Sequence, residues 1–187
     1  MDPIERRVFN QGALIGALAF VVGGVETMLT PREAQAQNVP LRTLKPEEAK
    51  TLAAMGEALV SGARDAGVVQ FVDQQISIPP EEALLEARIM NVRPPVANFY
   101  RAAFGAIEGA SKEHHGGRGF AELNPTEQHD FIDAMRQNKI EGWKGPAGGF
   151  VYAVLRADSV DVVYGTMEGY AQLGVPYQAH IAPEKRW

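Results

Sequence analysis

Apolar residues recur at intervals of three and four along most of the chain, and this spacing restricts the fold more than any other feature of the sequence. The strongest run begins at Val96 and continues through Tyr100, Phe104 and Ile107. Residues three and four apart lie on one face of an α-helix, so the run predicts a helix with one buried face. We expect it to reach about Lys112.

Other segments carry helix signals of their own. Pro46 and Pro125 mark helix starts, because proline lacks the N–H that the first helical residue would leave unpaired. Glu127 stands where its side chain can bond back to the capping Asn124. The remaining predicted helices follow Asp65, cover residues 81–90, and cover about 150–163, where β-branched residues also allow a strand over 159–163. The sequence predicts an all-α fold, a single irregular helical domain of about five or six helices.

The composition fits one domain and excludes several kinds of site. The chain has 187 residues, 45% of them hydrophobic, which is enough for one core. It contains no cysteine, so it has no disulfide, no thiolate metal site and no covalent haem attachment. Its net charge of −5 makes nucleic acid an unexpected partner, since phosphate binding requires clustered Lys and Arg.

The histidines offer little chemistry. His114 and His115 are adjacent in a glycine-rich loop, without a third metal ligand at helical spacing. His129 and Asp133 are four residues apart on a predicted helix, where the carboxylate could orient the imidazole or the two could form a solvated surface pair. We therefore predict no catalytic, cofactor-binding or metal-binding residue in this chain, and a protein that acts on another protein.

The first 36 residues have the layout of a removable export signal. Arg6 and Arg7 precede an apolar run over residues 12–25, and Ala34-Gln35-Ala36 has the small-residue form of a signal peptidase site, cleaved after Ala36. The run is shorter than the roughly 20 residues that a membrane-spanning helix needs. The alternative is an uncleaved anchor that continues to Leu29, at the cost of placing a glutamate inside the membrane.

The arginine pair resembles a twin-arginine motif. Phe9 stands two places after Arg7, as in that motif, whereas Glu5 stands where Ser or Thr is usual. Proteins with such a signal are exported in folded form, so the twin-arginine translocase and signal peptidase are expected partners. The predicted domains are a signal peptide over residues 1–36 and a helical domain over residues 37–187.

The helical spacing ends after Tyr164. Large apolar residues are scattered there among glycine, proline and polar residues, which predicts an extended, irregular C-terminal tail over residues 164–187. Such a tail has to bury its apolar groups, either against its own domain or on a partner. The predicted partner contacts are Tyr164, Tyr170, Tyr177 and Trp187.

Four blocks of the sequence match a known family of small subunits. They are LKPEEA at 44–49, AGVVQFVDQQ at 66–75, FAELNPTEQ at 120–128, and VVYGTMEGY with LGVPY at 162–170 and 173–177. In these blocks the chain resembles gluconate 2-dehydrogenase subunit 3. Many members of that family carry Tyr-Gly-Gly-Asn near the C-terminus, whereas this chain has Tyr164-Gly165-Thr166.

The resemblance implies a non-catalytic accessory subunit. In such assemblies a large flavoprotein of the glucose-methanol-choline type holds FAD and oxidises a sugar or sugar acid, and a multihaem cytochrome c subunit commonly passes on the electrons. The small subunit would carry the export signal for the flavoprotein and stabilise it in the periplasm, bound to the membrane through the complex. The alternative is a free-standing exported enzyme or ligand-binding protein with a site under the tail, built from His129, Asp133 and Tyr164.

Overall fold

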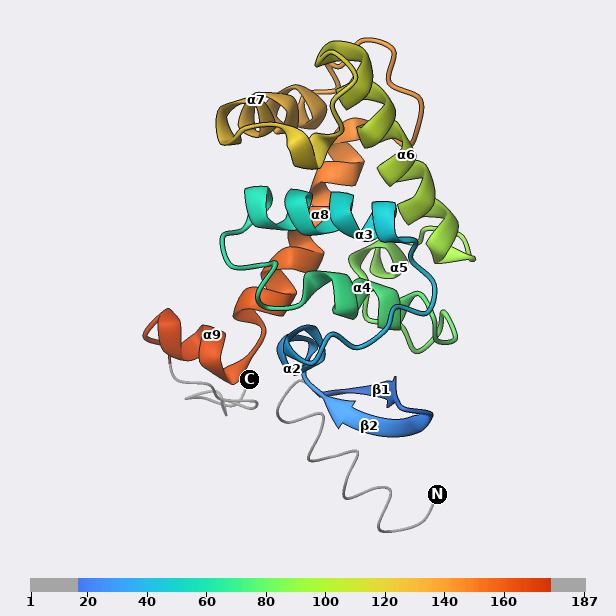
Figure 1. Ribbon diagram of the computed structural model, residues 1–187, viewed down its shortest axis with the longest axis vertical. Helices are drawn as coiled ribbons and strands as arrows, with labels where there is room; N and C mark the ends of the chain where they lie inside the picture. Colours follow the sequence, from blue (N-terminus) through green and yellow to red (C-terminus); the bar gives the residue numbers. More distant parts are fainter. Residues whose placement is uncertain (1–16, 176–187) are drawn as a thin grey trace, which may run out of the picture.

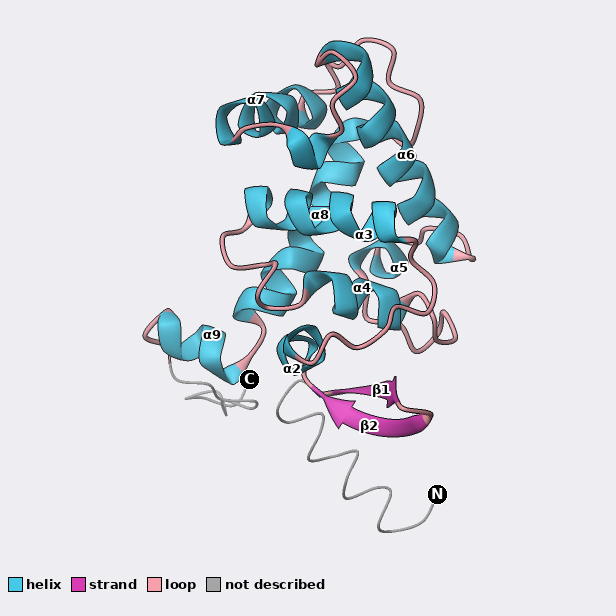
Figure 2. Ribbon diagram, viewed as in Figure 1, coloured by secondary structure: helices cyan, strands magenta, loops and turns pink. Residues whose placement is uncertain are grey.

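The computed structural model describes residues 17–175, which form helices around one hydrophobic core and a β-hairpin at one end (Figures 1 and 2). In chain order the elements are β1 (Leu18–Val22), β2 (Val25–Leu29), α2 (Pro31–Ala36), α3 (Pro46–Leu59), α4 (Val68–Gln75), α5 (Glu86–Ile89), α6 (Val96–His114), the 3-10 turn η1 (Phe120–Glu122), α7 (Pro125–Arg136), α8 (Gly148–Tyr164) and α9 (Met167–Gln172). The predicted mainly helical fold is confirmed.

The helix α8 is the centre of the core. It runs along the long axis of the molecule, with α3 and α4 lying across it (Figure 1). Its buried apolar side chains are Val151, Val154, Leu155, Val162 and Val163. Packing against α3, α4, α5 and α7 buries it from several sides, so the strand considered for residues 159–163 does not form.

Three helices begin where their local signals predict. At the start of α3, the Lys45 N–H donates to the Glu48 carboxylate at 2.8 Å. At the start of α7, the Glu127 N–H donates to the Asn124 side chain at 3.0 Å, and the Asn124 N–H donates back to Glu127 at 2.9 Å. The long helix α6 begins at Val96 as expected. These starts are encoded within a few residues of chain.

The helix predicted after Asp65 begins later than expected. The turn before α4 ends at Gly67, whose φ of 86° lies in the left-handed region that favours glycine. All residues of α4 are buried, including Gln70 and Asp73. It is therefore a central helix, buried on all sides.

The helix predicted over residues 81–90 is wrong over its first half. Only α5 forms, because distant side chains bind the backbone groups that a longer helix would use. The Leu84 N–H donates to the Gln75 side chain at 2.6 Å, and the Glu86 N–H donates to the Asp158 carboxyl at 3.0 Å. Between them Leu85 is extended and fully buried.

The tail is not irregular throughout, since α9 forms within it. The Gly169 N–H donates to the Thr166 side chain at 3.0 Å, which caps the helix. A Cβ on Gly169 would overlap the carbonyl oxygen of Val163, so α9 lies with its backbone directly against the end of α8. The prediction of an irregular segment is wrong for Met167–Gln172.

A β-hairpin occupies part of the predicted signal segment. Val21, Val22 and Val25 favour extended backbone, and Gly23 with Gly24, at φ of 58° and 83°, forms the two-residue turn between the strands. The prediction from the sequence did not include these strands. Within residues 17–175, no helix has the length and apolar character needed to cross a membrane.

A single carboxylate fixes the path of the chain into α3. Asp73, which is 4% exposed, accepts backbone N–H groups from Arg42 at 2.8 Å, Thr43 at 2.9 Å and Leu44 at 2.7 Å. Hydrogen bonds to a charged acceptor contribute more than neutral ones. The side chain therefore joins α4 to the segment before α3.

We predict that Asp73→Asn lowers the free energy of unfolding by about 2–4 kcal/mol, because one accepting oxygen becomes a donor that faces backbone N–H groups. Urea denaturation of the purified chain measures the change. The exposed Asp65→Asn is the matched control and should leave the stability within about 0.5 kcal/mol. Equal stabilities of the two variants would contradict this role of Asp73.

Candidate partner interface

In the part of the chain that the structure describes, no histidine belongs to a group of side chains that could bind a metal ion. The His114 ring nitrogen Nε2 lies 2.9 Å from the carbonyl oxygen of Glu141, and the His115 ring packs near Phe131 with centroids 6.4 Å apart. Among residues 17–175, no group of three or more His, Cys, Asp or Glu side chains could hold a metal ion. His114 is the last residue of α6 and His115 follows it as the C-cap, so the glycine-rich loop expected to hold both begins only after them.

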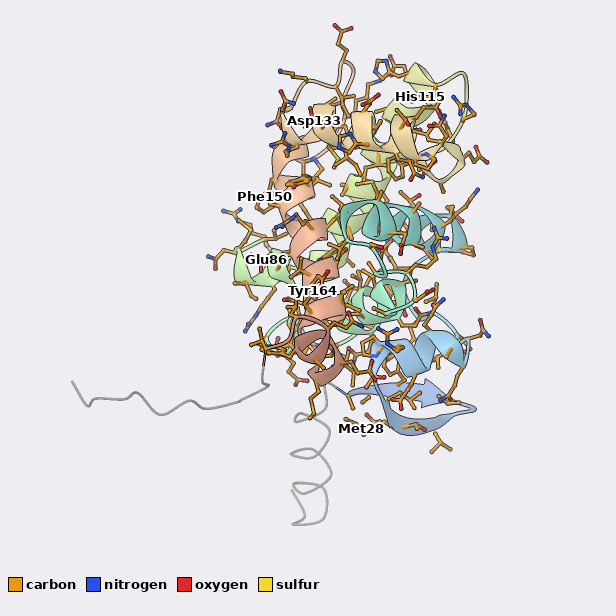
Figure 3. All side chains as sticks on the ribbon, turned by 90° about the vertical axis from the view of Figure 1, so that its left-hand side faces the viewer. Met28, Glu86, His115, Asp133, Phe150 and Tyr164 are labelled. Atoms are coloured by element: carbon orange, nitrogen blue, oxygen red, sulfur yellow. The ribbon has the colours of Figure 1, made fainter. Side chains whose placement is uncertain are left out.

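The three residues of the alternative site do not come together. His129 is exposed and its Nδ1 lies 3.8 Å from Asp130, whereas Asp133 accepts hydrogen bonds from Arg136 and Gln137. The Arg136 guanidinium holds the pKa of Asp133 below its usual value. Asp133 lies near one end of the molecule and Tyr164 far from it along α8 (Figure 3). The side chains of His129 and Asp133 are 83% and 44% exposed and have different partners.

A buried carboxyl, Asp158, joins three helices. Its Oδ2 accepts the Tyr100 hydroxyl at 2.6 Å and its Oδ1 accepts the Glu86 N–H at 3.0 Å, which links α8 to α6 and α5. Burial raises the pKa of Asp158 to about 7, and burial together with this carboxyl raises the pKa of Tyr100 well above its usual value. Asp158 is not among the residues predicted from the sequence. Its signal was an aspartate on the apolar stripe of Val154 and Val162.

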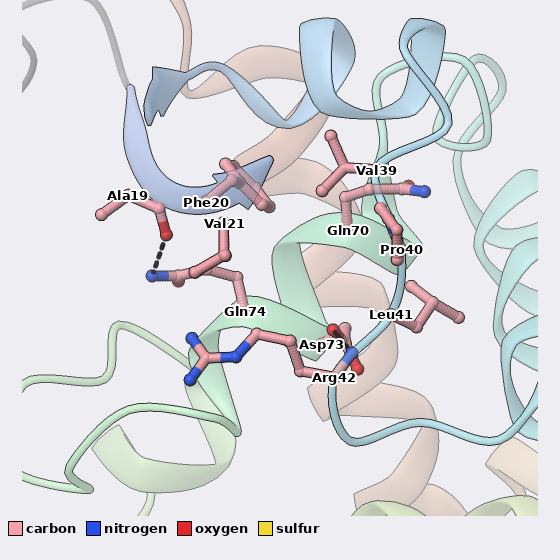
Figure 4. Close-up of a pocket in the computed structure, with 10 residues that line it drawn as sticks. All are labelled: Ala19, Phe20, Val21, Val39, Pro40, Leu41, Arg42, Gln70, Asp73 and Gln74. Atoms are coloured by element: carbon pink, nitrogen blue, oxygen red, sulfur yellow. Dashed lines mark hydrogen bonds between the residues drawn. The ribbon is translucent and has the colours of Figure 1, made fainter. Parts of the chain in front are cut away.

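The described part of the chain includes two small cavities with defined linings. One, of about 10 Å³, lies between β1, α4 and residues 39–42 (Figure 4). The other, of about 70 Å³, is lined by Met135, Asn138, Ile140, Trp143, Ala147 and Gly148. Pockets for small molecules usually measure about 300–1,000 Å³. Neither cavity has room for a flavin or a haem.

Eight large apolar side chains are exposed in the described part of the chain: two, Val21 and Val25, on the hairpin, and six in or next to α5 and α9. The α9 patch consists of Met167, Leu173 and Val175, and the α5 patch consists of Leu84, Ile89 and Met90. Each of these side chains is between 44% and 58% exposed. Both α5 and α9 contact α8. Grouped apolar exposure of this kind is typical of protein interaction sites.

The predicted contact residues lie partly beside the α9 patch. Tyr164 is half-buried against the main core at the end of α8, and Tyr170 is half-buried on α9. Tyr177 and Trp187 lie outside the described residues, as do Arg6, Arg7 and Phe9 of the predicted signal. The role of these tyrosines in partner binding stays a prediction, and the exposed side chains next to them are aliphatic.

The start of α9 also meets the N-terminal segment. Arg32 on α2 forms an ion pair with Glu168 on α9, with Nε and Oε2 3.4 Å apart. Figures 1 and 3 both show α2, the hairpin and α9 at the same end of the molecule. The pair is exposed, so it contributes little energy by itself. It shows that the two ends of the described chain are neighbours.

A known protein family matches most of the helical part of the chain. A model of the family described as gluconate 2-dehydrogenase subunit 3 matches residues 46–181. The chain belongs to this family. The match begins at the first residue of α3 and includes both apolar patches, whereas the hairpin and α2 lie outside it. The description is that of a subunit, which supports an accessory role in an oxidoreductase complex. Comparisons with curated proteins and with solved structures found no match.

We predict that Asp158→Asn flattens the pH dependence of stability. Below pH 3.8 the Asp158 carboxyl is neutral in the folded and in the unfolded chain. Between pH 3.8 and about pH 7 it is ionised in the unfolded chain but stays protonated in the folded one. The contribution of Asp158 to the free energy of unfolding of the wild type therefore falls as pH rises through that range, by up to about 4 kcal/mol. Urea denaturation at pH 4, 5.5 and 7 measures it.

The control for this prediction is Asp130→Asn on the exposed surface of α7, which should keep the wild-type profile. Because other carboxyls of the chain titrate as well, the difference between the wild-type and variant curves is the quantity to compare. A difference that stays constant from pH 4 to pH 7 would rule out a protonated Asp158 in the folded chain.

Proposed function

We propose that the chain is the non-catalytic small subunit of a periplasmic, membrane-associated, FAD-dependent dehydrogenase of the glucose-methanol-choline type. The observation that carries this proposal is the family match over residues 46–181. In the proposed complex a large flavoprotein holds FAD and the substrate, and a multihaem cytochrome c accepts the electrons. This chain binds the flavoprotein, stabilises it and carries its export signal.

The arrangement of the described residues supports a binding role. The ring of His114 contacts a backbone carbonyl at the surface, and the buried carboxyl of Asp158 accepts two hydrogen bonds inside the core. Apolar side chains are exposed in the α5 and α9 patches. A subunit that needs only to bind a partner requires an apolar surface on a rigid support. The central helix α8 is that support for both α5 and α9.

The two patches supply only part of the free energy that a stable interface needs. Full burial of a large apolar side chain contributes about 1.5–3 kcal/mol, so six half-exposed ones contribute about 5–9 kcal/mol. Association costs about 4–15 kcal/mol in lost freedom. The patches alone therefore give at most a weak complex. We propose that Tyr164, Tyr170, Tyr177 and Trp187 add the aromatic contacts that tighten it.

The export role rests on Arg6, Arg7 and Phe9. A flavoprotein acquires FAD by folding around it in the cytoplasm, so the loaded complex has to cross the membrane in folded form. A twin-arginine signal on the small subunit would direct both chains to the translocase. The complex then acts in the periplasm.

The decisive test is co-expression with an FAD-dependent flavoprotein subunit of the glucose-methanol-choline type. We expect that replacing Arg6 and Arg7 together by Lys keeps the assembled, active dehydrogenase in the cytoplasm. Activity in periplasmic and cytoplasmic fractions measures the distribution. A double replacement of Arg93 and Arg156 by Lys, both exposed, is the matched control and should leave export unchanged. Full periplasmic activity of the flavoprotein without this chain would refute the proposal.

A second prediction concerns the α9 patch. Gly169→Ala places a methyl group against the backbone of Val163 and Tyr164, so it should displace α9 and weaken flavoprotein binding about tenfold or more. Gly109→Ala on α6 meets open space and is the matched control. Leu173→Glu charges the patch without a change in the core and should weaken binding similarly.

Titration of the purified flavoprotein with each variant gives the affinities for this second prediction, and thermal unfolding of each free variant shows that its core is intact. Affinities of Gly169→Ala and Leu173→Glu equal to that of the wild type would mean that the partner binds elsewhere.

A further inference from the structure

The predicted peptidase site lies in a helix whose start has a complete capping box. At the start of α2, the Glu33 N–H donates to the Thr30 hydroxyl at 3.2 Å and the Thr30 N–H donates to the Glu33 carboxylate at 2.8 Å, with Pro31 at the first helical position. This is the same reciprocal pairing that begins α7. Ala34 and Ala36 both belong to this helix.

One face of α2, with Pro31 and Ala34, is buried against the body of the protein, whereas Arg32, Glu33 and Ala36 are exposed. A helix of six residues is not stable alone in water, so it depends on its contacts. Ala34 is 0% exposed and packs in a small apolar cluster with Phe20, Leu29 and Val39. Beyond the helix, the Val39 N–H donates to the Ala34 carbonyl at 3.0 Å. The chain from Thr30 to Val39 is thus one packed unit.

The backbone of α2 fits directly against the turn before α4. A Cβ on Gly67 would overlap the carbonyl oxygen of Pro31, so this position excludes any side chain for reasons of space. Its φ of 86° favours glycine as well. Gly62 has nearly the same φ, 85°, but open space around it. The comparison separates the contact with α2 from the conformational requirement.

The hairpin continues this packing on α4. The Gln74 side chain donates to the carbonyl oxygen of Ala19 at 3.3 Å, and Phe20 and Val39 line the small cavity beside Gln70 (Figure 4). A cut after Ala36 would remove Phe20, Leu29 and Ala34 from the apolar cluster and leave Val39 without them.

We infer that residues 30–39 are a permanent part of the folded subunit, and that any leader removed on export ends before Thr30. This inference rests on the proposed export of a folded chain, since a chain folded before crossing would reach the peptidase with α2 already formed. A peptidase binds its substrate as an extended strand. The Ala34 side chain that it would have to bind is buried in a helix.

The test on the natural protein is the intact mass and N-terminal sequence of the small subunit in the purified periplasmic complex. We expect an N-terminus at or before Thr30. A subunit that begins at Gln37 would overturn the inference. If the subunit is found only in the cytoplasm with residues 1–187 intact, the proposed export fails, and the inference is then decided by hydrogen exchange.

Hydrogen exchange of the full-length chain tests the packing independently of export. The amides of Ala34, Gln37 and Val39, which donate within this segment, should be protected at least tenfold over an unfolded peptide. Gly67→Ala should remove that protection, whereas Gly62→Ala should keep it. Thr30→Ala, which deletes only the cap, should raise exchange in α2 alone. Unprotected amides in the wild type, or full protection in Gly67→Ala, would overturn the inference.

Discussion

The burial of α8 is the interaction on which the structure depends. Its apolar stripe packs against α3, α4, α5 and α7, and the aspartate on that stripe finds a hydroxyl and a backbone N–H inside the core. An unpaired carboxyl at this depth would be costly. The two hydrogen bonds of Asp158 therefore hold α6 and α5 against α8. The position of the α5 patch follows from the position of α8.

The sequence predicts those parts of the fold whose signals are local. The starts of α3 and α7 are set by a proline and a glutamate within four residues, and α6 by its own apolar spacing. The extent of α5 could not be predicted, because Gln75 and Asp158 bind its preceding backbone from other helices. The hairpin was missed although Gly23-Gly24 between β-branched residues is a turn signal, since the apolar run also fits an export signal.

The candidate interface was predictable only in outline. The sequence indicated that apolar groups near the C-terminus have to be buried, either against the domain itself or on a partner, and the predicted contacts were three tyrosines and Trp187. The structure shows that Tyr164 and Tyr170 are half-buried, while aliphatic residues of α5 and α9 are exposed. Which apolar residues remain exposed depends on how the helices pack, and that is a property of the whole chain.

The contact of Gly169 with the end of α8 has an evolutionary consequence. The backbone of Gly169 touches the end of α8, whereas the side chains of Met167, Glu168, Ala171 and Gln172 are exposed. Substitutions there can accumulate at little cost in folding. A subunit built in this way can follow sequence drift in the protein it binds, or acquire a new one, by altering a single short helix while its scaffold is conserved.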